Sequence, residues 1–328
     1  MRIPVTRAFV LIAAAVLSGP TAHAEPAALP GEVAVGPAMP GSFFAAPEGD
    51  GPFPTIVLIG GSGGGDGTVR RLAPRFLEQG YAVFGLVYYS PAWFGRPAQF
   101  PDLPRAFDAI PVERAGEARA FLCARAEVRC DRIGIYGVSK GAEFALLAGA
   151  YLDGFAAIAA IVPSDVVWEG WGPGTEPGQV SSFSLDGHPL PFVPYEGMQA
   201  AFAKLAKGER ARLRLPHDAG RRAHPDRAIE ARIPVERIAV PVFVAGGDAD
   251  DTWNSGGMAQ TILERRTEAG LPTTALVFTD AGHGLSGDGS NAEGWYADEE
   301  LRVQRAIWPA TLNFFESVLA AGPDADQD

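Results

Sequence analysis

The stretch GIYGVSKGAEF at residues 134–144 decides how the fold of this chain is interpreted. A short apolar segment leads to Ser139, which stands between Gly137 and Gly141 in the pattern G-x-S-x-G, and the apolar segment FALLAGAYL follows at 144–152. A sharp strand-to-helix turn exposes a serine hydroxyl at the edge of a sheet and directs the helix N-terminus at developing negative charge. The stretch therefore predicts such a turn with a nucleophilic serine. The alternative is an ordinary serine that caps a helix.

Strands and helices are expected to alternate along the chain around this turn. Continuous apolar runs indicate buried parallel strands, and apolar residues at helical spacing indicate helices. The runs predict strands at 54–60, 81–89, 132–137, 155–162, 241–247 and 274–280. Helices are expected at 68–80, around 112–126, from Ser139 onward and roughly at 302–320. This order predicts an α/β fold with a mostly parallel central sheet flanked by helices on both faces.

The alternation is interrupted at about 164–236, between two of the expected strands. This segment contains Trp168, Trp171, many Pro and Gly residues, and the basic run KGERARLRLPHDAGRRAH at 207–224. A long insertion near the carboxyl edge of the sheet is a candidate cap over the active site, and we expect one here. The basic run itself is interpreted as a solvated surface that does not contact substrate.

A serine nucleophile needs a base and an acid that follow it in the chain. His283 stands in DAGHGL, directly after the last expected strand, where the base belongs in this chain order. GGDADDTWNS includes the end of the strand at 241–247 and offers Asp248, Asp250 and Asp251 as the acid. The residues alone do not choose among these three. They lack the spacing of a calcium loop, so no metal site is predicted.

An oxyanion hole requires two backbone N–H groups near the nucleophile. One is expected from Lys140, the residue after the serine, and the other from the glycine-rich loop GGSGGGDG at 60–67. Gly61, Ser62 and Gly63 are the candidates within that loop. A phosphate cradle is the rival interpretation, but the loop has neither the G-K-[ST] ending nor the dinucleotide spacing, and no cofactor is predicted.

The composition excludes one class of partner. The chain has 328 residues, a formal net charge of −12 and a pI of about 4.9. An acidic surface repels phosphate backbones, so nucleic-acid binding is not expected. After the N-terminal segment, no apolar run is long enough to predict a membrane span. The oligomeric state is not indicated.

Residues 1–24 have the organisation of a signal peptide. Two arginines precede the apolar run AFVLIAAAVLS at 8–18, and AHA at 22–24 forms a small-x-small cleavage site. We therefore expect cleavage after Ala24 and a periplasmic or secreted location. The run at 8–18 is too short to span a bilayer as a helix.

Cys123 and Cys130 are the two cysteines of the chain. In an oxidising compartment such a pair can form a disulfide. Two buried free thiols are the alternative, and only geometry decides between them.

Together these stretches resemble the catalytic domain of the acyl-CoA thioesterase and bile acid-CoA:amino acid N-acyltransferase (BAAT) family, a group of α/β-hydrolases. The resemblance is carried by GYAVFGLVYYS (80–90), IGIYGVSKGAEFALLAGAYL (133–152), IPVERIAVPVFVAGGDADDTWNS (233–255) and FTDAGHGL (278–285). The pattern G-x-S-K-G-x-E is more specific than the general G-x-S-x-G turn, and D-x-x-W-x-S adds independent support.

The resemblance implies an α/β-hydrolase domain over 53–322. Residues 25–52 before it are rich in Ala, Pro and Gly and are expected to form a linker or irregular lead-in. The resemblance also implies Ser139 as nucleophile, His283 as base and Asp250 as acid, with Asp248 as the second choice. The family motif also includes Lys140 and Glu143. We interpret their side chains as an i,i+3 ion pair at the surface.

The expected activity is that of a serine hydrolase. Members of the family with a serine nucleophile hydrolyse acyl compounds, so cleavage of acyl thioesters or carboxylic esters through an acyl-enzyme is expected. Coenzyme A is essentially a cytoplasmic metabolite, and export therefore favours ordinary esters. The alternatives are an exported carboxylesterase, dienelactone hydrolase-like enzyme or peptidase, and, from another class, a non-catalytic binding protein on the same fold.

Overall fold

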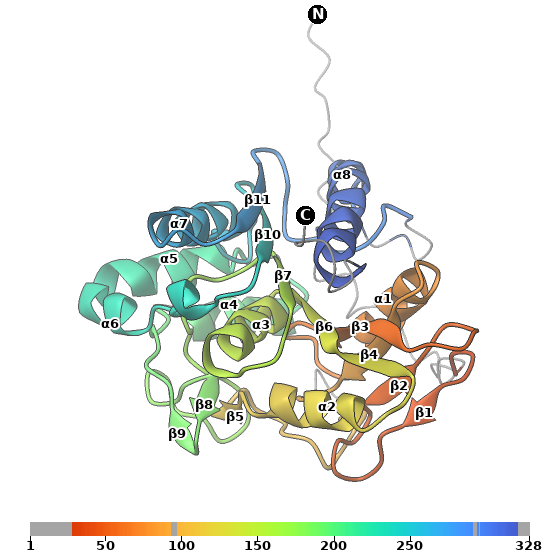
Figure 1. Cartoon of the computed structure of the whole chain (residues 1–328). Coiled ribbons are helices and arrows are strands. Elements are labelled where there is room, and N and C mark those ends of the chain that lie inside the picture. Colours follow the sequence, from red (N-terminus) through yellow and green to blue (C-terminus); the bar gives the residue numbers. More distant parts are fainter. Residues whose placement is uncertain (1–27, 93–96, 291–293, 295, 321–328) are drawn as a thin grey trace, which may run out of the picture.

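The central sheet runs in the order β1-β2-β4-β3-β6-β7-β10-β11 in the computed structural model, which describes residues 28–92, 97–290, 294 and 296–320 (Figure 1). The six core strands from β4 to β11 are parallel to one another. These core strands are β3 (Phe53–Ile59), β4 (Ala82–Leu86), β6 (Val128–Val138), β7 (Ala157–Ile161), β10 (Val242–Gly247) and β11 (Thr273–Phe278). Because parallel strands end at the same edge, the loops after β3, β6, β10 and β11 meet there.

Helices cover both faces of the sheet. One face carries α2 (Arg114–Cys123), α3 (Lys140–Tyr151) and α7 (Ser255–Glu268). The other carries α1 (Gly67–Leu77) and α8 (Asp298–Phe315), which continues into a π-helical turn at Glu316–Ala320. The α/β-hydrolase fold expected from the sequence is therefore present.

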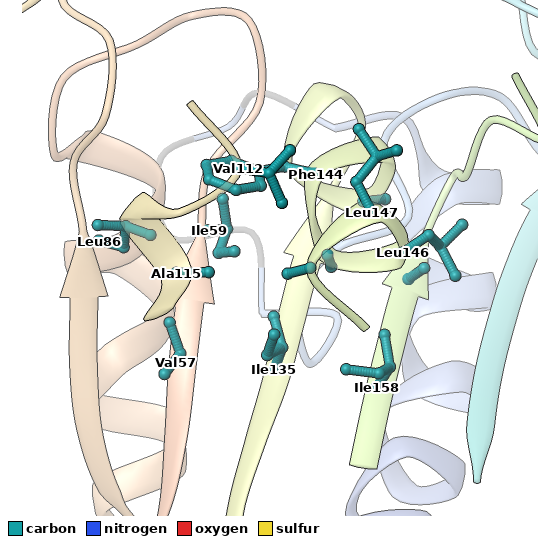
Figure 2. Packing of buried hydrophobic residues seen from close by; sticks show 14 of the residues in the cluster. Val57, Ile59, Leu86, Val112, Ala115, Ile135, Phe144, Leu146, Leu147 and Ile158 are labelled. Atoms are coloured by element: carbon teal, nitrogen blue, oxygen red, sulfur yellow. The ribbon is translucent and has the colours of Figure 1, made fainter. Parts of the chain in front are cut away.

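Alternating residues of β3 supply the two halves of the core. Val57 and Ile59 pack with residues of α2 and α3, whereas Ile56 and Leu58 pack with residues of α1 and α8. Figure 2 shows the first layer, in which the side chains of β3, β6 and β7 face those of α3. Successive side chains of a strand point to opposite faces, so a strand with helices on both sides must be apolar throughout.

The lead-in at 25–52 differs from the linker expected there. It contains β1 (Val33–Ala34) and β2 (Phe43–Ala45), and β2 pairs antiparallel with β4. Phe43 and Phe44 are buried, and a Cβ on Gly85 of β4 would lie 2.4 Å from the ring of Phe43. Glycine at position 85 thus leaves room for the aromatic ring that attaches this segment to the sheet.

The insertion at 164–236 folds beside the carboxyl edge of β7 and β10 (Figure 1). Its elements are β8 (Phe183–Leu185), β9 (His188–Pro189), α4 (Met198–Ala206), α5 (Arg214–Ala223), α6 (Pro225–Glu230) and a 3-10 turn at Val235–Arg237. β5 (Ile110–Pro111) joins β8 and β9 in a small second sheet. A cluster that includes Trp168 and Val193 of the insertion together with Trp253 and Met258 attaches this cap to the domain.

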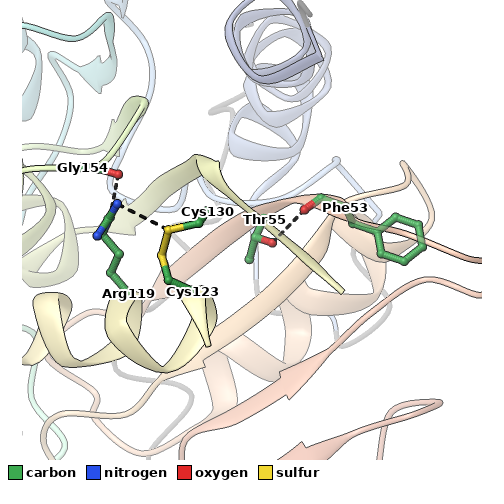
Figure 3. The surroundings of a disulfide bond; sticks show 6 residues. All are labelled: Phe53, Thr55, Arg119, Cys123, Cys130 and Gly154. Atoms are coloured by element: carbon green, nitrogen blue, oxygen red, sulfur yellow. Dashed lines mark hydrogen bonds between the residues drawn. A yellow bond between two sulfur atoms is a disulfide. The ribbon is translucent and has the colours of Figure 1, made fainter. Parts of the chain in front are cut away.

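Cys123 and Cys130 form a disulfide, which decides the alternative left open by the sequence (Figure 3). The bond joins the last residue of α2 to β6, with the two Cα atoms 4.8 Å apart. Arg119 of α2 donates hydrogen bonds to the carbonyl of Gly154 and to the sulfur of Cys130. The disulfide therefore attaches a helix on one face directly to a central strand.

The predicted signal peptide at 1–24 lies outside the described residues. Among the helices that the structure does describe, none has the length and apolar character needed to cross a membrane.

Candidate active site

Ser139 occupies a strained turn between β6 and α3. Its φ of 57° and ψ of −121° lie in a region that non-glycine residues rarely adopt. A Cβ on Gly137 would lie 2.1 Å from the carbonyl oxygen of Gly141. A Cβ on Gly141 would lie 2.3 Å from the carbonyl oxygen of Ile59. Both glycines of the motif are thus required because backbone atoms of the strand, the turn and the helix approach each other closely.

Ser139, His283 and Asp250 form a continuous line of hydrogen bonds. Ser139 Oγ lies 2.9 Å from Nε2 of His283, and Nδ1 of His283 lies 2.8 Å from Oδ2 of Asp250. The carboxylate can only accept, so Nδ1 carries the proton and Nε2 is free to accept the serine proton. Such a line is the geometry in which a histidine activates a serine hydroxyl.

The loop after β10 surrounds Asp250 with donors. Oδ1 accepts from the N–H groups of Thr252 and Trp253, and Oδ2 accepts from the hydroxyl of Ser255 at 2.6 Å. Burial alone would raise the pKa of Asp250. The charge and hydrogen bond of His283, with the bonds from Ser255 and Thr252, outweigh burial and hold this pKa below its ordinary value. Asp250 is therefore placed to remain an anion beneath the imidazole.

The other two aspartates of this loop do not reach the histidine. Asp248 and Asp251 are exposed, and Asp251 forms an ion pair with Arg212 at 2.9 Å. Of the residues expected to supply the acid, the structure brings only Asp250 to His283.

The glycine-rich loop after β3 lies against the serine. A Cβ on Gly61 would be 3.1 Å from Cβ of Ser139. Ser62 and Gly63 line the same cavity as Ser139 and Lys140. Tyr88 donates to the carbonyl of Gly60 at 2.9 Å and so holds the start of the loop. The expected oxyanion residues are therefore together, and the three loop positions remain candidates for the second amide.

Lys140 and Glu143 do not form the surface ion pair expected from their spacing. Both side chains are buried, with Lys140 Nζ 2.8 Å from Glu143 Oε2 and 2.8 Å from Ser182 Oγ. Glu143 Oε1 accepts from the N–H of Trp168 at 3.1 Å. Ser182 and Trp168 belong to the cap, so the pair joins the cap to α3. The i,i+3 spacing could not predict this burial, because Ser182 and Trp168, which bond to the pair, are far from it in sequence.

The basic run at 207–224 also differs from its interpretation as a solvated surface. Arg214 donates to the carbonyls of Asp248 and Asp250 at 2.6 and 3.3 Å, and to Asn254 Oδ1 at 2.9 Å. His217 is buried in the same run. The sequence contained one signal for this, since Leu213 and Pro216 interrupt the basic residues of the run.

A cavity of about 510 Å³ opens beside Ser139. The cap contributes much of its wall, through Trp171, Tyr195, Met198, Phe202, Leu205, Leu213 and His217. Pro91, Trp171, Tyr195, Met198 and Phe202 also border a second cavity of about 890 Å³. Residues of the insertion at 164–236 thus line the cavity beside Ser139, and the wall of this cavity is mostly apolar.

Comparison with known proteins agrees with this geometry. Residues 110–287 match the family described as BAAT / Acyl-CoA thioester hydrolase C terminal. Acyl-coenzyme A thioesterase 1 of Rattus norvegicus is 33% identical over 246 residues, covering 74% of this chain and 51% of the relative. Acyl-coenzyme A thioesterase 5 of Mus musculus is 27% identical over 242 residues, covering 72% and 50%. The chain spans about half the length of the curated relatives it matches.

Comparison with solved structures supports the fold independently of the sequence matches. MGS-M1, an alpha/beta hydrolase enzyme from a Medee basin deep-sea metagenome library, superimposes with a TM-score of 0.51 at 16% identity, covering 86% of this chain and 94% of that one. At this identity the likeness concerns the fold. The family match covers more than half of the chain and includes Ser139, Asp250 and His283. The chain therefore belongs to the BAAT / acyl-CoA thioester hydrolase C-terminal family of α/β-hydrolases.

Proposed function

We propose that this protein is a serine hydrolase that cleaves acyl thioesters or carboxylic esters through an acyl-enzyme. The observation that supports this most directly is the hydrogen-bonded line from Ser139 through His283 to Asp250, open to a largely apolar cavity. Ligand binding alone does not require a strained serine, a histidine and a buried carboxylate joined by hydrogen bonds.

In the first half of the reaction, Ser139 Oγ attacks the acyl carbonyl carbon and His283 Nε2 takes the hydroxyl proton. The tetrahedral intermediate then collapses, and the departing alcohol or thiol receives that proton from His283. In the second half, water gives a proton to His283 and attacks the acyl-enzyme, which releases the acid and restores Ser139. Asp250 holds the imidazole in one tautomer and stabilises its cation throughout.

The oxyanion of both intermediates needs donors already in position. We assign one to the N–H of Lys140 and the other to the loop at Gly61, Ser62 or Gly63, which packs against Ser139. The N-terminus of α3 directs its dipole at the same point, which favours negative charge there.

The catalytic assignment is tested with a fluorophosphonate probe, which labels activated serines. We expect rapid labelling of the wild type, none of S139A and strongly slowed labelling of H283A. H188A is the matched control, because His188 is exposed in β9, and it should label like the wild type. Equal labelling of H283A and the wild type would contradict the assignment.

The leaving group is tested by comparing an acyl-CoA with a p-nitrophenyl ester of the same chain length. The relatives are named acyl-CoA thioesterases, which supports a thioester for this chain as well. An exported enzyme would meet esters instead. A kcat/KM that is at least about tenfold higher for one of the two compounds, which is about 1.4 kcal/mol of transition-state binding, would decide the class.

We also propose that the chain is exported. The signal-like segment at 1–24 and the Cys123–Cys130 disulfide both support an oxidising destination. Sequencing the N-terminus of the protein from a periplasmic or culture-medium fraction should find Glu25. Full-length protein confined to the cytoplasm would contradict export.

A further inference from the structure

His217 is a buried histidine that the proposed mechanism does not use. It belongs to α5 of the cap, is 5% exposed, and lines the same cavity as Ser139. Its ring meets the rings of Trp168, Tyr195 and Trp253 nearly edge to face, with centroids 4.6, 4.8 and 5.6 Å away. The ring of Trp253 also contacts that of His283 at 5.6 Å. Three aromatic rings therefore fix the orientation of His217 next to the catalytic histidine.

The hydrogen bonds of His217 define its tautomer. Nδ1 lies 2.7 Å from the carbonyl oxygen of Leu213, and a carbonyl only accepts, so Nδ1 carries the proton. Burial lowers the pKa of His217 to about 3, with the charges of Lys140 and His283 acting in the same direction. At neutral pH the ring is uncharged, and Nε2 has a lone pair and no proton.

The surroundings make this acceptor selective. Met198, Phe202, Leu205 and Leu213 line the same cavity, and their side chains carry no N–H or O–H group that could donate to Nε2. A buried acceptor left unpaired costs about 1–3 kcal/mol, and a hydrogen bond is stronger where water is excluded. A substrate that fills the cavity without a donor would impose that cost, whereas a substrate with a donor would not. A carboxylate or phosphate group would face a lone pair and be disfavoured.

We propose that His217 is a specificity-determining residue whose Nε2 accepts a hydrogen bond from a hydroxyl or amide N–H group on the substrate. The proposal rests on the hydrolase function above and adds a substrate class to it. Acyl compounds that carry such a donor are preferred over matched compounds that lack it.

Three matched pairs of substrates test this preference. A hydroxyl on the acyl side is tested by p-nitrophenyl 3-hydroxybutyrate against p-nitrophenyl butyrate. An acyl amide is tested by p-nitrophenyl N-acetylglycinate against p-nitrophenyl 4-oxopentanoate. A hydroxyl on the leaving group is tested by 2-hydroxyethyl butyrate against propyl butyrate. Each kcat/KM is divided by the rate of alkaline hydrolysis, so that intrinsic reactivity does not enter the ratio. We expect a ratio of at least about threefold for one pair, the value of a modest hydrogen bond.

Two substitutions then separate recognition from a structural role. H217F keeps an aromatic ring and removes the acceptor, and we expect the preferred ratio to fall about three- to tenfold. H217Q keeps an amide that can donate to Leu213 and accept from the substrate, and its ratio should stay above that of H217F. If melting shows that H217F is unfolded, H217L replaces it as the acceptor-free variant.

The outcomes are distinct. If His217 had only a structural role, replacing it would lower kcat/KM for both substrates of every pair by the same factor. Ratios in H217F equal to those of the wild type, or equal ratios in H217F and H217Q, would therefore overturn the inference. That result would leave the hydrolase intact as long as the wild type is active and S139A is not. Equal inactivity of the wild type and S139A on all six compounds would instead reject the proposed function, and this inference with it.

Discussion

Asp250 is distinguished from its two acidic neighbours by the hydrogen bonds of its loop, not by its own chemistry. Its oxygens accept from backbone N–H groups, from Ser255 and from His283, whereas Asp248 and Asp251 remain exposed. All three have nearly the same sequence environment, so residue type could not separate them. The resemblance to the family selected Asp250, and the donors around it give the physical reason.

Replacing Asp250 by asparagine should disable catalysis while leaving the protein folded. The amide oxygen would keep the N–H groups of Thr252 and Trp253, and the NH₂ group would replace Oδ2. That NH₂ group would face Nδ1 of His283 as a donor and so favour the wrong imidazole tautomer. We expect kcat to fall about 10²- to 10⁴-fold, as for the corresponding change in serine proteases. Hydrolysis of p-nitrophenyl butyrate measures it.

The matched control is D251N, because Asp251 is in the same loop but pairs with Arg212 at the surface. Its kcat should stay within about twofold of the wild type, since exposed pairs contribute little. Equal losses in both variants would mean that the loop as a whole, and not the acid, had been disturbed.

At the scale of elements, α3 follows Ser139 and also joins the cap to the central domain. Lys140 and Glu143 occupy its first turn, and their side chains reach Ser182 and the backbone of Trp168 in the cap. Burial lowers the pKa of Lys140 and raises that of Glu143, each opposed by its partner. The two charges are held in the interior only because each is close to the other and hydrogen-bonded.

Replacing Lys140 by methionine should therefore destabilise the protein in a pH-dependent way. Without the cation, burial raises the pKa of Glu143 further above its ordinary value of 4.5. A carboxyl whose pKa is raised by folding costs nothing below its unfolded pKa and destabilises as the pH rises through its folded pKa. We expect a loss of about 3–5 kcal/mol near pH 7.5 and a smaller loss near pH 4.5, measured by urea unfolding.

Two further variants make this result interpretable. K140M/E143Q removes both charges and keeps an acceptor for the N–H of Trp168, so it should recover a large part of the loss at pH 7.5. K204M, an exposed lysine of α4, should stay within about 0.5 kcal/mol of the wild type. A loss in K140M that is the same at both pH values would contradict a buried, uncompensated carboxyl.

The sequence predicted the strands that carry continuous apolar runs and missed elements that have no such run. Every strand expected from a continuous apolar run is present as β3, β4, β6, β7, β10 or β11. The helix α7 was not predicted, because it begins Ser-Gly-Gly and mixes buried and exposed residues. The strands β1 and β2 were also missed, since two or three residues carry no periodicity.

At the scale of the whole molecule, the sequence predicted the layered fold and the meeting of the three proposed catalytic residues. Parallel strands bring their carboxyl ends to one edge, so Ser139, Asp250 and His283 could be brought together without coordinates. The position of the cap could not be predicted from the order of the strands. Its position depends on contacts such as Arg214 with the loop after β10 and Lys140 with Ser182, which join parts far apart in sequence.

Removing the disulfide should lower the stability of the whole domain without changing its chemistry. The bond closes a short loop between α2 and β6, and such loops contribute about 2 kcal/mol. C123A/C130A should melt several degrees below the wild type. Its kcat on p-nitrophenyl butyrate should be close to that of the wild type.

A reductant supplies the control. Dithiothreitol should lower the melting temperature of the wild type toward that of C123A/C130A and leave the double variant unchanged. If the reductant has no effect on the wild type, the two cysteines are not joined in the protein that was purified.

The buried bond between Lys140 and Ser182 has a consequence for recombination between relatives. The proposed catalytic residues follow core strands, while the cavity wall comes largely from 164–236. Exchanging this segment alone between relatives would transfer most of the cavity wall in one piece. However, a donor cap without a hydroxyl at position 182 would remove one of the two side-chain partners of the buried Lys140 ammonium and leave it only Glu143. A stable chimaera should therefore take the cap and the residues of α3 that bond to it, Lys140 and Glu143, from the same parent. These two segments are separated in the sequence, so they must be exchanged as two pieces.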